Sequence, residues 1–152
     1  PERAARCAPV PATLAAPVRD SLRKRFPDGL YAHQSAAIEA SIAGNDLCVA
    51  TSTASGKSLI FMSAAAHRLC ADREARVLAL YPARALIQDQ IAKWQTFLGP
   101  LGLSVGLIDG GVDTRQRAEI LERHHVVLMT PDVAHAWALS RAGERPVRRF
   151  LE

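Results

Sequence analysis

The amino-acid sequence predicts an α/β fold in which a mostly parallel sheet is flanked by helices. Short, uninterrupted apolar runs recur along the chain, as is typical of strands that are buried on both faces. Segments of helical length and mixed polarity separate these runs, and strands that alternate with helices form right-handed crossovers within a parallel sheet. The chain has 152 residues, 49% of them hydrophobic, which suits one globular domain with a single core.

The expected elements follow one another in a regular order. Residues 1–18 are rich in proline, alanine and arginine and are expected to form a flexible arm or linker. A basic amphipathic stretch at residues 18–26 precedes a helix at residues 32–43, which Gly44 can end. The expected strands are residues 47–50, 77–81, 105–108 and 126–129. The helices expected among them are residues 57–70, 84–97 and 114–123.

Composition narrows the possible partners and compartments. The formal net charge is +4 and the pI is about 9.4, which favours polyanionic partners without identifying one. Cys7, Cys48 and Cys70 are widely spaced and form no Cys-x-x-Cys pair. That pattern argues against a disulfide framework or a zinc site and favours a reducing cytoplasm. No apolar stretch approaches the roughly 20 residues of a membrane span, so no membrane partner is expected.

The most informative segment is the loop between the first expected strand and the helix after it. Residues 51–58 contain small polar residues that end in Gly56-Lys57-Ser58 at the start of a helix. A bound triphosphate needs converging backbone N–H groups, a cation, and a hydroxyl on the bridging metal ion, and these three residues can supply them. Thr51, however, stands where the common pattern has its first glycine. An alternative interpretation therefore remains open, in which this segment is a polar strand-to-helix turn with a solvated Lys57 and binds no nucleotide.

The order of motifs along the chain is more specific than any one of them. They are Leu30-Tyr31-Ala32-His33-Gln34, the loop at residues 51–58, Leu80 to Gln90, Asp109-Gly110-Gly111 and Thr130-Pro131-Asp132. This succession resembles the superfamily 2 helicases over about residues 19–152. The resemblance is to their first RecA-like motor domain, a three-layer P-loop NTPase fold. The residues of these motifs are most similar to those of DEAH-type DNA-repair helicases of the Hrq and Mrf kind.

The resemblance implies ATP and Mg²⁺ as cofactors. It assigns Gln34 to the adenine edge, to which a carboxamide offers both a donor and an acceptor. Lys57 and Ser58 take the catalytic roles, Lys57 at the phosphates and Ser58 as a ligand of Mg²⁺. The phosphate turn itself is expected to consist of Thr53, Ala54, Ser55 and Gly56. Tyr31 could stack near the base, but a place in the core is favoured.

The resemblance also implies contacts with the backbone of a nucleic acid, expected to be single-stranded DNA. Pro82 can begin a helix whose first turn carries Arg84, a cation for phosphate contact. The expected contact residues are Pro82, Ala83, Arg84, Gln90, Gly110, Gly111, Thr130, Pro131 and Asp132. Thr130 and Pro131 also have the chemistry of a helix start. Trp94 is interpreted as a residue that packs against the sheet.

Several other polar residues are interpreted as structural or solvent-exposed. His124 and His125 have no third ligand at metal spacing and are expected at a turn or surface. Five arginines are expected to lie on solvated faces. They are Arg115, Arg117, Arg145, Arg148 and Arg149.

The acidic strand-end motif that helicase motors of this type use does not occur in the sequence. We therefore expect residues 19–152 to be an incomplete RecA-like domain, separated from the rest of its motor and from a second RecA-like domain. Such a piece could bind ATP and contact a strand weakly, but would not unwind a duplex alone. Two alternatives remain open at this point. One is a complete small P-loop NTPase or kinase with Asp109 as its Mg²⁺-organising acid; the other is a non-catalytic nucleic-acid-binding module.

Overall fold

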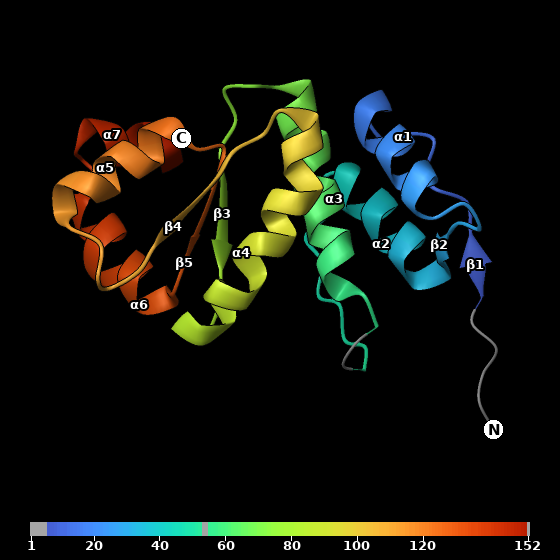
Figure 1. Ribbon diagram of the computed structural model, residues 1–152, viewed down its shortest axis with the longest axis horizontal. Helices are drawn as coiled ribbons and strands as arrows, with labels where there is room; N and C mark the ends of the chain where they lie inside the picture. The colour runs from blue at the N-terminus through green and yellow to red at the C-terminus, as the bar shows by residue number, and fades with distance from the viewer. Residues whose placement is uncertain (1–5, 53–54, 152) are drawn as a thin grey trace. The chain divides into compact units, whose positions relative to one another are not determined.

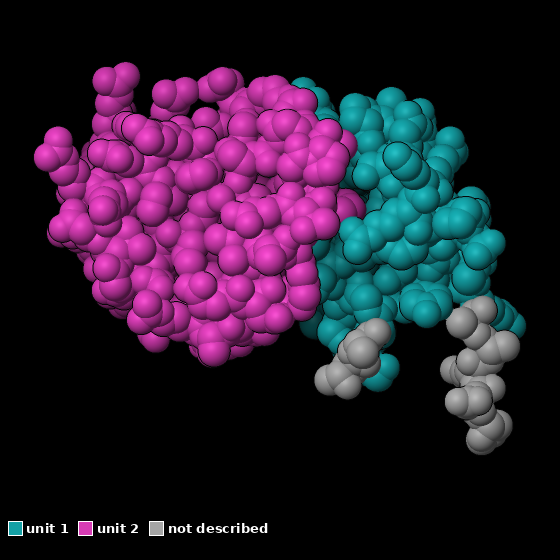
Figure 2. Space-filling view, viewed as in Figure 1, with its two compact units in different colours: residues 1–72 teal, residues 73–152 magenta. Residues whose placement is uncertain are grey.

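The computed structural model describes residues 6–52 and 55–151 of the chain. These residues form two compact units, residues 1–72 and residues 73–152 (Figure 2). Each unit has its own group of buried side chains. Among the described residues, no helix is both long and apolar enough to cross a membrane.

The first unit combines a short antiparallel ribbon with three helices (Figure 1). Strand β1 (Cys7–Ala8) pairs with β2 (Leu30–Tyr31). The helices are α1 (Ala16–Arg25), α2 (Ala32–Ile42) and α3 (Lys57–Ala71). Both α1 and α2 pack against α3. Their contact buries Val18, Leu22, Ile38, Ala66 and Leu69 completely, so the apolar stripes of the helices hold this unit together.

The described part of the expected flexible arm is packed rather than free. Val10, Leu14 and Val18 are buried, and the Ser35 hydroxyl donates a hydrogen bond to the carbonyl of Pro9 at 2.9 Å. Helix α1 starts at Ala16 with a proline in its first turn, where the fixed φ of proline suits a helix. The prolines of this segment therefore end and begin elements, and its spaced apolar side chains anchor it; residues 1–5 lie outside the described part.

The strand expected at residues 47–50 does not form. These residues have no regular secondary structure, and Leu47, Cys48 and Ala50 are exposed. A strand is stable only when a neighbour satisfies its backbone N–H and C=O groups. The strands described in this unit are the two-residue strands of the ribbon, which pair with each other. An apolar run alone was therefore insufficient to predict a strand here.

The second unit contains the predicted parallel sheet. Its strands are β3 (Val77–Leu80), β4 (Val105–Ile108) and β5 (Val126–Met129), in the order β3-β5-β4. Both pairings are parallel, and Leu80 and Ile108 are each in register with Met129. The four residues of β5 are all buried, as expected for a central strand with covered faces. The carboxyl ends of the three strands consequently meet at one edge.

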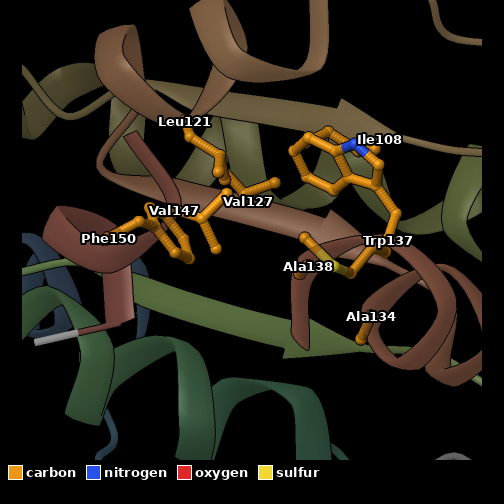
Figure 3. Close-up of a cluster of buried hydrophobic side chains, with 9 residues drawn as sticks. Ile108, Leu121, Val127, Ala134, Trp137, Ala138, Val147 and Phe150 are labelled. Atoms are coloured by element: carbon orange, nitrogen blue, oxygen red, sulfur yellow. The ribbon is translucent and has the colours of Figure 1, made fainter. Parts of the chain in front are cut away.

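Helices cover both faces of this sheet (Figure 1). Helix α4 (Arg84–Leu98) lies on one face, and α5 (Thr114–Arg123), α6 (Pro131–Val133) and α7 (Arg145–Leu151) lie on the other. Between α6 and α7 the chain forms a π-helical turn at residues 134–138 and a 3₁₀ turn at residues 139–141. The second face carries a cluster of buried side chains (Figure 3). Its members are Ile108, Leu121, Val127, Met129, Ala134, Trp137, Ala138, Val147 and Phe150.

The two neighbouring histidines expected at a turn or surface are half-buried and contribute to packing. A Cβ atom on Gly106 would lie 2.6 Å from the His124 ring and 2.6 Å from the side chain of Ile120, so β4 needs a glycine where α5 ends against it. Burial lowers the pKa of His124, which keeps the ring neutral near pH 7. His125 Nδ1 lies 2.9 Å from the hydroxyl of Ser104, just before β4. His124 therefore packs against β4, and His125 links the residue before β4 to the residue before β5.

Candidate nucleotide and nucleic-acid sites

In the first unit, the loop before α3 holds the ammonium group of Lys57. Lys57 is the first residue of α3, and its Nζ donates to the carbonyl oxygens of Thr51 and Ser52 at 2.8 and 2.7 Å. The Thr51 hydroxyl also lies 2.6 Å from the hydroxyl of Ser55. A glycine at position 51 could not supply this hydroxyl contact, so the departure from the common pattern leaves the loop closed by side chains. Thr53 and Ala54 lie outside the described residues.

The start of α3 provides a second set of donors. The helix has 15 residues and carries no acidic residue in its first turn. The N–H of Leu59 donates to the carbonyl of Gly56 at 3.1 Å. The N–H groups of Lys57 and Ser58, which precede it, have no carbonyl partner within the helix, and the helix dipole adds partial positive charge there. Ser58 is half-buried at the second helical position. Backbone donors, the Lys57 ammonium and the Ser58 hydroxyl therefore form a donor set that fits a polyphosphate.

Gln34 links α2 to this loop. Its side chain is almost buried, with 5% of the residue exposed. Its Oε1 accepts a hydrogen bond from the backbone N–H of Tyr31 at 3.1 Å, which satisfies a donor at the start of α2, as in a capping box. Its Nε2 donates to the carbonyl of Gly56 at 3.1 Å and lies 3.4 Å from that of Ser55. The amide assigned to the adenine edge thus already has protein partners at both ends.

The two aromatic side chains before Gln34 differ in exposure, because Tyr31 is exposed and His33 is half-buried. Tyr31 is 44% exposed, so the favoured interpretation as a core residue is wrong. Its ring stacks on that of His33, with centroids 5.8 Å apart and planes at 14°. His33 Nε2 also lies 3.2 Å from the carbonyl of Ser55. His33 lies within the first motif, but no role was predicted for it; it joins Gln34 in contacting the loop.

Gly56 is required by this arrangement for two reasons. Its φ is +76°, in the left-handed region, and a Cβ atom would overlap sterically with Gln34 Nε2. We expect Gly56→Ala to destabilise the protein by about 1–3 kcal/mol through strain and the clash. Gly44 has a similar φ of +89° with no atom near its Cβ position, so Gly44→Ala is a matched control for strain alone.

Guanidinium-induced unfolding of the two alanine variants separates the two contributions. Gly56→Ala should be the more destabilising variant, and the excess over Gly44→Ala should shrink when Gln34 is also replaced by alanine. Equal losses of stability in the two single variants would contradict the contact between Gln34 and Gly56.

In the second unit, three predicted nucleic-acid segments meet at the carboxyl edge of the sheet. Residues 82–84 follow β3, residues 109–111 follow β4 and residues 130–132 follow β5, and the register of the strands places these ends side by side. Pro82, Ala83 and Arg84 are exposed. Arg84 Nε lies 2.7 Å from Oδ2 of Asp109. The sequence motifs that lie far apart along the chain are thus brought together here.

The turn after β4 is held by side chains at both ends. The backbone N–H of Gly111 donates to Oδ1 of Asp109 at 2.8 Å. Arg117 donates from Nε to the carbonyl of Val112 at 2.7 Å and from Nη2 to that of Asp109 at 3.2 Å. Its guanidinium lies 5.4 Å from the centre of the buried Trp137 ring. Arg117 is therefore a structural clamp, contrary to its interpretation as a solvated residue.

The segment after β5 begins a helix as predicted. Thr130 Oγ1 accepts a hydrogen bond from the backbone N–H of Val133 at 3.4 Å, and Pro131 occupies the first turn. The capping role of Thr130 is therefore confirmed. Pro131 and Asp132 are exposed, and the negative charge of Asp132 in the first turn weakens the attraction of this short helix for a phosphate.

Two residues of α4 lie away from the exposed edge. Gln90 is 8% exposed, and its Nε2 donates to Oδ2 of Asp89 at 2.8 Å. The structure therefore does not present Gln90 beside Arg84 at the surface. Trp94 is 1% exposed and donates from Nε1 to the hydroxyl of Tyr81 at 2.8 Å. The prediction that Trp94 packs against the sheet is confirmed, and it ties α4 to the end of β3.

Within the part of the chain that the structure describes, no group of three or more His, Cys, Asp or Glu residues could hold a metal ion. This finding concerns metal sites built from protein ligands alone. It leaves the predicted role of Ser58 untested, because a nucleotide-bound Mg²⁺ takes ligands from phosphates and water and needs few from the protein.

Comparisons with known proteins agree with the motif order. The chain is 29% identical over 136 residues to the uncharacterized ATP-dependent helicase YprA of Bacillus subtilis, covering 88% of this chain and 18% of YprA. It is 33% identical over 112 residues to the ATP-dependent helicase HRQ1 of Saccharomyces cerevisiae, covering 71% of this chain and 10% of HRQ1. The chain thus spans less than a fifth of these relatives.

A solved structure gives the same result for the fold. The crystal structure of the DUF1998 helicase MrfA bound to DNA and AMPPNP superimposes with a TM-score of 0.84 at 27% identity, covering 98% of this chain and 20% of that one. The predicted RecA-like α/β class and the resemblance to helicases of the Hrq and Mrf kind are confirmed. Residues 31–150 match the family described as "DEAD/DEAH box helicase". This chain belongs to the DEAD/DEAH box helicase family.

Proposed function

We propose that the chain is the ATP-binding portion of an ATP-dependent helicase that acts on DNA. One observation carries the nucleotide half of this proposal: at the start of α3 the Lys57 ammonium donates to the carbonyls of Thr51 and Ser52, and Gln34 donates to the carbonyl of Gly56. A polyanion at the loop would replace the carbonyl oxygens that now accept from Lys57. Those bonds keep the ammonium beside the helix start until a phosphate arrives.

Each residue of the loop has a distinct part in this proposal. Lys57 neutralises phosphate charge, the backbone N–H groups of the α3 start bind phosphate oxygens, and Ser58 contacts Mg²⁺. Bound ATP supplies the phosphoanhydride bond whose hydrolysis drives a helicase. Gln34 can offer its amide to the adenine only if it releases Tyr31 or the loop, so base recognition and loop position are coupled through one side chain.

Fluorescence titration with a labelled ATP analogue, with and without Mg²⁺, tests the nucleotide half. We expect saturable binding that strengthens when Mg²⁺ is present, because the metal offsets the charge of the phosphates. If Mg²⁺ does not strengthen binding of the ATP analogue to folded protein, the result would favour the alternative of a non-catalytic nucleic-acid-binding module, whose loop no longer binds nucleotide.

The carboxyl edge of the second unit supports the nucleic-acid half of the proposal. Arg84 and the exposed Gly110 and Gly111 lie at this edge, and glycines allow a backbone to approach closely. DNA is proposed as the substrate because MrfA was crystallised with DNA. Contacts of this kind bind phosphate and read little sequence.

Salt dependence checks this proposal. If the three edge segments contact about three phosphates of a single strand, the slope of log affinity against log salt concentration should be about −2. Anisotropy titrations of a labelled oligodeoxynucleotide at several salt concentrations measure the slope, and an oligoribonucleotide of matching sequence measures the preference for DNA. An affinity that does not change with salt would contradict phosphate contact.

The geometry disfavours the small kinase alternative. Both carboxylate oxygens of Asp109 already have partners: Oδ2 pairs with Arg84, and Oδ1 accepts from the Gly111 N–H. To organise Mg²⁺, Asp109 would have to share or release these partners. The family match over residues 31–150 also favours the helicase assignment.

A further inference from the structure

We propose that Asp109 is a positioning residue that holds Arg84 in place for contact with a nucleic-acid phosphate. This inference rests on the proposed function, in which Arg84 meets the strand backbone. It gives Asp109 a role that is neither metal binding nor direct contact with substrate.

The ion pair between the two residues is asymmetric. The side chain of Asp109 is 7% exposed, whereas that of Arg84 is 65% exposed. A buried carboxylate without a cationic partner is costly, so Asp109 retains Arg84 beside it. Arg84 remains accessible to solvent while its guanidinium is fixed at one edge. The buried member of the pair is thus the anchor, and the exposed member is the group available to a ligand.

The pair leaves most of the guanidinium donors available. The contact with Asp109 is made by Nε, and arginine carries four further N–H donors on its two Nη atoms. Among the described residues, no hydrogen bond from either Nη atom of Arg84 is found. A phosphate could therefore bind the Nη atoms without displacing Asp109. Because the long side chain is already held, binding would lose less side-chain entropy than with a free arginine.

Asp109 is itself held by the turn that follows it. Its Oδ1 accepts from the Gly111 N–H, and Arg117 donates to its backbone carbonyl. Arg117 is in turn fixed by Val112 and by the face of Trp137. The carboxylate that orients Arg84 is therefore connected to the buried core of the unit.

Gly111 keeps the space beside the pair open. A Cβ atom at this position would lie 3.3 Å from Asp109 Oδ1 and 3.4 Å from Arg84 Nη2. The first distance is slightly shorter than an ordinary van der Waals contact and the second is at its lower limit, so the methyl group of an alanine would press on the Asp109 carboxylate and touch Arg84. The φ of Gly111 is not positive, so alanine is a conformationally allowed test of this space.

The decisive variant is Asp109→Asn in the full-length protein. Asparagine keeps an acceptor for the Gly111 N–H but loses the charge that holds Arg84. If Asp109 positions Arg84, affinity for a labelled oligodeoxythymidylate should fall about fivefold, less than the loss of a whole charge-assisted contact because Arg84 itself remains. If Asp109 acts only as a negative charge near the strand, the same variant should bind more tightly. The two explanations thus predict changes of opposite sign.

Asp113→Asn is the matched control, because Asp113 is exposed nearby and asparagine can still cap α5. It should leave oligonucleotide affinity unchanged or slightly higher. A fall in affinity equal to that of Asp109→Asn would overturn the proposal, since neutralising either carboxylate would then have the same effect.

The double variant Arg84→Ala with Asp109→Asn shows whether Asp109 acts through Arg84. We expect it to bind as weakly as Arg84→Ala alone. Additive losses would contradict the positioning role while leaving phosphate contact by Arg84 intact. If Arg84→Ala alone has no effect, the proposed contact of Arg84 with the strand fails instead.

Gly111→Ala provides a second route if Asp109→Asn does not fold. It leaves both charges in place but crowds the pair, and should weaken oligonucleotide binding about threefold, with no further loss when Arg84 is already alanine. Unchanged binding in a folded Gly111→Ala protein would overturn the proposal.

Discussion

Replacing Lys57 with alanine is expected to lower the rate of ATP hydrolysis by the full-length protein at least about a hundredfold. Lys57 begins α3, and its ammonium lies 2.7–2.8 Å from two carbonyl oxygens of the loop. Alanine would remove the cation that balances phosphate charge while keeping a good helix former at the start of α3. A steady-state phosphate-release assay with saturating DNA measures the effect.

Lys24→Ala is a suitable control for this experiment. Lys24 is an exposed residue in the last turn of α1, in the same unit as Lys57, so both variants lose one positive charge from that unit. Hydrolysis by Lys24→Ala should stay close to that of the unaltered protein. Retention of hydrolysis in Lys57→Ala would show that the loop does not supply the phosphate cation.

Replacing Trp94 with alanine is expected to destabilise the 152-residue chain by about 3–5 kcal/mol, the usual cost of emptying a large buried aromatic site. Trp94 is 1% exposed, and its Nε1 donates to the hydroxyl of Tyr81. The substitution would therefore leave a cavity under α4 and an unpaired hydroxyl at the end of β3. Guanidinium unfolding followed by circular dichroism measures the change in the free energy of unfolding.

Tyr81→Phe separates the hydrogen bond from the packing. It removes the acceptor of the Trp94 N–H but keeps both rings, and should cost about 1–2 kcal/mol because a buried donor loses its partner. Burial raises the pKa of Tyr81, so the hydroxyl stays protonated at neutral pH. A Trp94→Ala variant as stable as the unaltered chain would contradict the placement of Trp94 in the core.

Much of the second unit could be predicted from the sequence because its signals are local. The bounds of β4, β5 and α5 agree with those expected, since each apolar run is short, continuous and bounded by helical segments. The run at residues 47–50 has the same local signal yet forms no strand. A strand forms only beside a pairing partner, and the residues of the apolar run do not show whether such a partner is available.

The residues of the candidate sites also differ in whether a local sequence pattern could predict their roles. Gly56 and Lys57 could be identified from one short motif, and the helix-capping spacing of Gln34 after Tyr31 was also present in the sequence. The clamp by Arg117 was not visible, because it depends on a carbonyl eight residues away and on the face of Trp137. The pairing of Arg84 with Asp109 likewise depends on how the strand ends meet. Three-dimensional proximity decided these roles.

The central claim is that the loop before α3 binds the phosphates of ATP. Titration of ¹⁵N-labelled chain with Mg²⁺-ATP, followed by amide NMR, tests this claim most directly. The account predicts that the largest shifts occur at the amides of Gly56, Lys57 and Ser58, with smaller ones near Gln34. Saturating nucleotide that leaves these amides unmoved, or that shifts only residues of the second unit, would contradict it.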